Sequence, residues 1–92
     1  MTAEHLGERI RQQVARLAPD GRIATLGSGD DVALGVAGLG FDSVRLVELL
    51  LLLEDELGVE LPAAALPSTQ PLTLGGFAAW VGARVAAAGR AR

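Results

Sequence analysis

One segment, residues 43–57, constrains the fold more than any other because its leucines recur at the spacing of an α-helix. Successive residues of a helix are about 100° apart, and at that spacing the expected core leucines all lie within roughly one third of the helix circumference. They are Leu46, Leu49, Leu50, Leu53 and Leu57. Gly58 follows directly and is typical of a helix C-terminus. The leucines at 49–53 are consecutive and cover more than one turn, so they cannot all point inward. The segment predicts a helix with one buried face and further apolar residues outside it.

Two other segments show helical spacing. Residues 2–18 carry an apolar stripe with charged and amide side chains on the other faces, as an amphipathic helix does, and Pro19 and Gly21 end it. Thr73 is a suitable N-cap for a last helix, and residues 63–66 can form a single turn before it. The expected core residues of the two long helices are Leu6, Ile10, Val14, Leu17, Leu74, Phe77, Ala78, Val81 and Val85.

Residues 19–42 form a long, glycine-rich connection. A structureless loop of that length is unusual in a small domain, so we expect a short helical turn near residues 31–34. We also expect its apolar residues to pack across the bundle: Leu26, Val32, Leu34, Val36 and Leu39. The glycines match neither nucleotide-binding motif, Walker or G-x-G-x-x-G. The predicted fold class is all-α, a small bundle of three main helices plus a short fourth, with a long first loop.

Composition argues against an enzyme. The chain has 92 residues, no cysteine, no lysine and one histidine, His5, so it offers no disulfide, thiolate or clustered metal site. A hydroxyl nucleophile normally needs a general base that a third group orients. No apolar stretch approaches the roughly 20 residues of a membrane span, and the N-terminus lacks the pattern of a signal peptide. We expect a single domain over residues 1–92, monomeric and cytoplasmic, without metal or membrane.

The charge is unevenly spread. The net charge is −3, and residues 42–62 contain six acids against one base, Arg45. Such a segment repels nucleic acid and steers a basic protein partner towards itself.

A second face of the central helix has the pattern of a docking surface. Next to the core leucines, this face carries three apolar residues, Val44, Val47 and Leu51. Three acids surround them: Glu48, Glu54 and Asp55. Apolar centres with charged rims are typical of protein interfaces. The alternative is that Val47 and Leu51 pack under the long loop and the acids only solvate the helix.

Ser43 begins this helix. A phosphodiester on its hydroxyl would lie at a helix N-terminus, where free backbone N–H groups and the macrodipole favour negative charge. The alternative is a serine that only caps the helix.

The run Leu39-Gly40-Phe41-Asp42-Ser43-Val44, with residues 47–49 and 53–62, resembles the acyl carrier protein family. The resemblance implies that Ser43 carries 4′-phosphopantetheine from coenzyme A, with Asp42 as part of the attachment motif. A separate phosphopantetheinyl transferase would attach the arm, and the chain would be a shuttle for other enzymes. The resemblance also implies partner contacts at seven residues: Val44, Arg45, Val47, Glu48, Leu51, Glu54 and Asp55.

Two features favour a natural-product pathway. Residues 40–43 are similar to polyketide-type carriers. Arg45 departs from fatty-acid-synthesis carriers, which often have an acid or a small polar residue there, and it dilutes the acidic surface beside the arm. Val44 stands where the family usually has leucine. The implied partners are an acyl- or aminoacyl-loading enzyme and ketosynthase- or acyltransferase-type enzymes. Met1 and the short tails favour a free-standing carrier over an excised synthase domain.

Two alternatives stay open. An aminoacyl or peptidyl carrier would use the same attachment with a different cargo. A non-carrier helical adaptor would use Ser43 only as a cap and bind a protein through Val44, Val47 and Leu51.

Overall fold

The computed structural model describes residues 3–27, 29–67 and 72–90, most of which are helical. The long helices are α1 (Ala3–Leu17), α3 (Ser43–Leu57) and α4 (Leu74–Arg90). A short helix, α2 (Arg22–Leu26), follows a 3₁₀ turn, η1 (Pro19–Gly21), and a second 3₁₀ turn, η2 (Ala63–Ala65), precedes α4. The described residues contain no strand, and one isolated antiparallel bridge joins Ala33 to Thr73. The predicted all-α class is confirmed, including the turn before the last helix.

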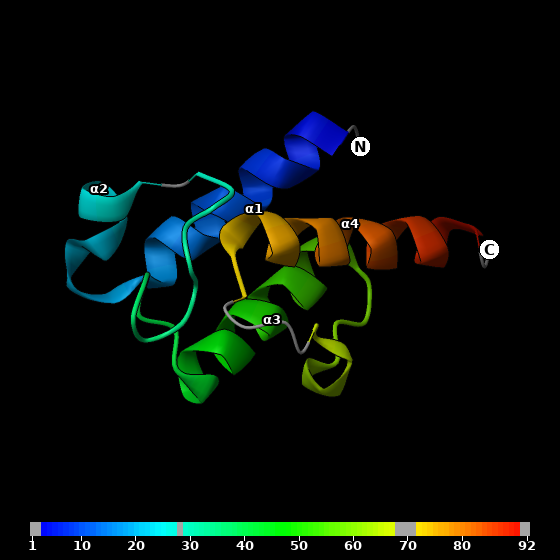
Figure 1. Cartoon of the computed structure of the whole chain (residues 1–92). Coiled ribbons are helices and arrows are strands. Elements are labelled where there is room, and N and C mark those ends of the chain that lie inside the picture. Colours follow the sequence, from blue (N-terminus) through cyan, green and yellow to red (C-terminus); the bar gives the residue numbers. More distant parts are fainter. Residues whose placement is uncertain (1–2, 28, 68–71, 91–92) are drawn as a thin grey trace.

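Helix α1 packs against both α3 and α4 and runs in the opposite direction to them (Figure 1). The start of α3 therefore lies at the end of the bundle that carries α2, and the start of α1 and the end of α4 lie at the opposite end (Figure 1). This arrangement places the start of α3, which is Ser43, at the same end of the bundle as the corner where α1 leads into α2.

The core is apolar and draws on all three long helices and the first loop. Its buried members are Leu6, Ile10, Val14, Leu34, Leu39, Phe41, Leu49, Leu50, Leu53, Leu61, Leu74, Phe77 and Val81. Leu17, Leu46, Leu57, Ala78 and Val85 were also expected in the core, and they pack against it partly buried. Each fully buried side chain of this size contributes about 1.5–3 kcal/mol to the stability of the fold. Helix periodicity therefore predicted most of the residues that stabilise the protein through burial.

Local signals in the sequence set the helix ends. The Thr73 hydroxyl oxygen accepts a hydrogen bond from the Gly76 N–H at 3.1 Å, which confirms the predicted N-cap of α4. Gly58 ends α3 with a φ of 68°, and its N–H donates to the Glu54 carbonyl at 2.9 Å. Only glycine adopts such a left-handed conformation without steric cost.

The first loop differs from the prediction in one respect. The helical turn expected near residues 31–34 is wrong: the helical residues come earlier, in η1 and α2. Ala33 instead forms the antiparallel bridge with Thr73: the Leu34 N–H donates to the Leu72 carbonyl at 2.9 Å, and the Leu74 N–H donates to the Val32 carbonyl at 2.8 Å. These non-local bonds use the backbone groups that a helical turn would need.

The expected packing of the loop is mostly confirmed. Leu34 and Leu39 are buried and Val32 is partly buried, whereas Val36 is 65% exposed. The packing predicted for the Leu26 side chain lies outside the described residues. Among the described helices, none is both long and apolar enough to cross a membrane.

Candidate functional site

Ser43 is the first residue of α3, and its side chain is exposed. The residue that caps the helix is Asp42, whose Oδ1 accepts a hydrogen bond from the Arg45 N–H at 2.9 Å. An aspartate at this position satisfies one of the free N–H groups of the first turn and complements the helix dipole. Asp42 therefore has the capping role that the alternative hypothesis gave to Ser43.

Arg45 lies two residues further along α3 and is half-buried. Its Nη1 donates to the carbonyl oxygen of Leu17, the last residue of α1, at 3.0 Å. The guanidinium thus satisfies a carbonyl at a helix C-terminus, where a positive charge is favourable. The family resemblance implied a partner contact for Arg45, and nothing in its local sequence indicated this contact with α1.

The three apolar residues predicted for docking are exposed. Val44 is 68% exposed, Val47 is 43% exposed and Leu51 is 59% exposed. The alternative that placed Val47 and Leu51 beneath the long loop is therefore wrong. We call Val44, Val47 and Leu51 the apolar patch; that it binds a partner stays a prediction.

The acids predicted to surround the apolar patch differ in their surroundings. Glu48 and Asp55 are exposed. Glu54 is half-buried, and its Oε2 accepts a hydrogen bond from the Leu61 N–H at 2.7 Å. Glu54 therefore holds the connector that follows α3, while Glu48 and Asp55 present their charge to solvent.

An apolar hollow of about 420 Å³ lies between the first loop, α3 and the segment after η2. Residues 33–38 form one wall of the hollow. Phe41 and Leu46 also line it, and these two residues precede and follow Ser43 in the sequence. Leu66, Pro67 and Leu72 complete the lining. The sequence did not indicate this hollow, because its walls come from three separate segments.

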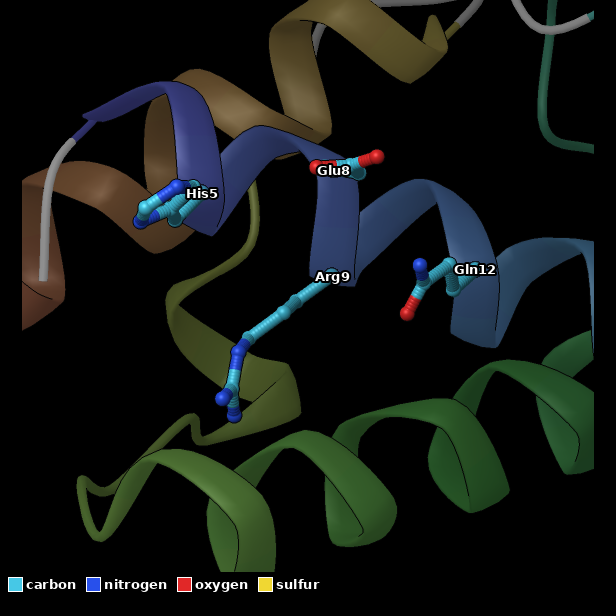
Figure 2. A pocket seen from close by; sticks show the side chains of 4 residues that line it. All are labelled: His5, Glu8, Arg9 and Gln12. Atoms are coloured by element: carbon cyan, nitrogen blue, oxygen red, sulfur yellow. The ribbon is translucent and has the colours of Figure 1, made fainter.

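A second hollow, of about 490 Å³, lies along α1 and is lined by His5, Glu8, Arg9 and Gln12. Figure 2 shows Arg9 extending from α1 towards α3, where its Nη1 contacts Glu56 Oε1 at 3.0 Å. In the part of the chain that the structure describes, no three His, Cys, Asp or Glu side chains are grouped to hold a metal ion. One helix supplies the whole lining, and its arginine is already paired, so we assign this hollow no function.

The site at the start of α3 suits modification by another protein. The Ser43 side chain is exposed, so a second protein can reach it. The chain's only histidine, His5, lies on α1 and not beside Ser43 in the sequence. A phosphodiester on Ser43 fits here because the helix start favours negative charge and Asp42 already provides the cap.

Comparison with known proteins agrees with this geometry. The family described as phosphopantetheine attachment site matches residues 8–81, which include α3, most of α1 and the first half of α4, up to residue 81. No curated protein and no solved structure matched the chain. The match confirms the resemblance to acyl carrier proteins and the predicted cofactor, 4′-phosphopantetheine. The chain belongs to the phosphopantetheine attachment site family, whose members carry this group covalently.

Proposed function

We propose that Ser43 is the attachment residue of this carrier, and that the chain delivers acyl intermediates to enzymes of polyketide or related natural-product biosynthesis. The observation that carries the proposal is the exposed Ser43 at the start of α3, with the capping bond supplied by Asp42. The match to the phosphopantetheine family spans this position. We propose one carrier domain, with Asp42 as part of its attachment motif.

The chain's own residues present and orient the arm. Ser43 supplies the hydroxyl oxygen, and the N-terminal turn of α3 supplies backbone N–H groups that favour the phosphate charge. The bound group contributes a terminal thiol, which holds an acyl group as a thioester. Catalysis then belongs to the partner enzymes, beginning with the phosphopantetheinyl transferase that loads the arm.

The apolar patch and the exposed Glu48 and Asp55 form the proposed partner surface. Three exposed apolar side chains provide contact area, and the two free carboxylates steer a partner with basic residues. The partners proposed are the transferase, a loading enzyme, and ketosynthase- or acyltransferase-type enzymes. Arg45 and Glu54 contribute less to this surface than their positions suggested, because both side chains bind backbone groups of the same chain.

The polyketide assignment rests on residues 40–43 and on Arg45, which stands where fatty-acid-synthesis carriers often have an acid or a small polar residue. An aminoacyl or peptidyl carrier is the second candidate, since it would use the same attachment site. The non-carrier adaptor loses its support, because Asp42 has the capping role and the matched family carries a covalent group.

Intact mass spectrometry tests the attachment site. The purified apo-protein is incubated with coenzyme A, Mg²⁺ and a broad-specificity phosphopantetheinyl transferase. We expect a gain of one phosphopantetheine in the wild type and none in Ser43→Ala. Ser28→Ala and Ser68→Ala remove the other two serines and serve as matched controls, which should gain the full mass. A full gain in Ser43→Ala would refute the assignment.

Cargo is tested on the loaded protein. It is offered malonyl-coenzyme A with an acyltransferase, or amino acids with ATP and an adenylation enzyme. Acyl transfer supports the polyketide-type reading, whereas exclusive aminoacyl loading would replace it with the second candidate.

A further inference from the structure

The corner between α1 and α2, residues 17–22, contacts the chain on both sides of Ser43: the backbone of the loop before it and the Arg45 side chain after it. We infer that this corner is a platform that positions Ser43 for modification, with Arg45 and Arg22 as its two positioning residues. The inference rests on the proposed attachment at Ser43. It assigns the two arginines a role in the geometry of the attachment turn and not in contact with the arm.

Arg45 makes the first link. Its side chain donates to Leu17 O at 3.0 Å, and its backbone N–H donates to the capping Asp42 carboxylate at 2.9 Å. One residue therefore joins the cap of α3 to the end of α1. Because helix ends fray unless their first and last groups are satisfied, this pair of bonds restrains the turn that carries Ser43.

Arg22, the first residue of α2, makes the second link. Its Nη1 donates to the carbonyl oxygens of Val36 and of Gly38, the latter at 3.2 Å. These carbonyls belong to the loop that leads into Ser43. A guanidinium suits this task because its rigid fork donates to several acceptors at once.

Gly40 completes the contact. Its φ is 92°, and a Cβ there would lie 2.7 Å from Pro19 Cγ and 3.3 Å from Arg22 Nη1. The backbone three residues before Ser43 thus rests directly on the corner. Phe41, between this contact and the cap, is buried in the core. Ser43 is exposed, whereas the segments before and after it are restrained by contacts with the corner.

Such a platform matters because the serine hydroxyl must be presented to a second protein's active site in a defined orientation. Ordering a loose turn during the reaction lowers its rate, whereas a turn ordered beforehand avoids that loss. We therefore expect the links to influence kcat of phosphopantetheine transfer more than KM.

Arg45→Gln is the main test, and Arg9→Gln is its matched control. Arg9 also links α1 to α3, through Glu56 near the far end of α3, so both variants lose one positive charge and one link between the same helices. We expect kcat of transfer to fall about tenfold in Arg45→Gln, as for loss of one charge-assisted hydrogen bond. Arg9→Gln should transfer at the wild-type kcat, and Arg45→Lys should recover part of the loss.

Amide hydrogen exchange of the unloaded protein provides a readout that needs no transferase. We expect faster exchange at residues 43–46 in Arg45→Gln and unchanged exchange there in Arg9→Gln. Arg22→Gln should accelerate exchange at residues 38–41. This variant also replaces Arg45→Gln as the test if Arg45→Gln does not fold. Wild-type kcat in a folded Arg45→Gln variant would overturn the positioning role, and wild-type exchange there would show that the corner does not restrain the turn. A KM increase that disappears at high salt would overturn it in favour of a charge contact with the transferase.

The same measurements separate this inference from the proposed function. If the wild type is not modified at Ser43, the attachment proposal fails, while the exchange data still decide whether the corner holds the turn. If Ser43 is modified at equal rates in all variants, the attachment proposal stands and the positioning role is refuted.

Discussion

Replacing Leu53 with alanine tests which face of α3 is buried. Leu53 is 0% exposed and belongs to the core cluster that joins α1, α3 and α4. Truncating a leucine in such a place removes its transfer free energy and leaves a cavity, at a cost of about 2–5 kcal/mol. For a domain of about this size, 1 kcal/mol shifts Tm by roughly 4–8 °C. We therefore expect Leu53→Ala to lower Tm by about 8 °C or more.

Leu51→Ala is the control because it makes the same chemical change two residues away in the same helix. Leu51 is 59% exposed, so its truncation should change the free energy of unfolding by no more than about 0.5 kcal/mol. The helix-propensity difference between leucine and alanine is common to both variants and cancels. Urea unfolding followed by far-UV circular dichroism gives both midpoints, which are comparable if the m-values agree.

Equal losses in the two variants would refute the orientation of α3 and with it the apolar patch. A larger loss in Leu51→Ala would mean that the helix is rotated relative to the core. If the stability difference is found, Leu51→Ala should still impair transfer to partner enzymes, since it removes part of the apolar patch without unfolding the chain.

Three further predictions concern the cap, the charges and the loop. Asp42→Ala should lower the free energy of unfolding by about 1 kcal/mol through loss of the N-cap, whereas Asp42→Asn should retain most of it in the same urea assay. Glu48→Lys with Asp55→Lys should slow association with a basic partner and flatten its salt dependence; stopped-flow rates unchanged at low salt would contradict steering. Gly38→Ala should cost more than about 1 kcal/mol, because a Cβ there would lie 2.0 Å from a loop carbonyl oxygen, while Gly35→Ala meets nothing within 4 Å and should be tolerated.

Helix periodicity was sufficient to predict the principal faces of the bundle. Leu49, Leu50 and Leu53 are buried and Leu51 is exposed, although all four belong to one run of leucines. The direction of each side chain follows from its angle around the helix, which depends on residue number alone. The Thr73 cap was predictable for a related reason, since its partner lies three residues away.

The errors and omissions involve contacts between distant segments. The helical turn in the first loop was misplaced because Val32 and Leu34 pair with residues near the start of α4. Arg45 and Leu17 are 28 residues apart, and no local pattern associates an arginine with the end of another helix. The position of Glu54 around the helix predicted an exposed acid. In the structure the connector after α3 folds back, and the Leu61 N–H donates a hydrogen bond to the Glu54 carboxylate.

The sequence by itself determined the all-α class, the buried and exposed faces of α3, and the motif that identifies the phosphopantetheine family. Each of these follows from residue types and spacings within a few turns of chain. The tertiary structure decided that the Arg45 side chain bonds to the end of α1, that the Arg22 side chain bonds to the loop before Ser43, and that an apolar hollow lies between the first loop, α3 and the segment after η2. These features depend on distances between segments, which are set only when the helices pack around a common core.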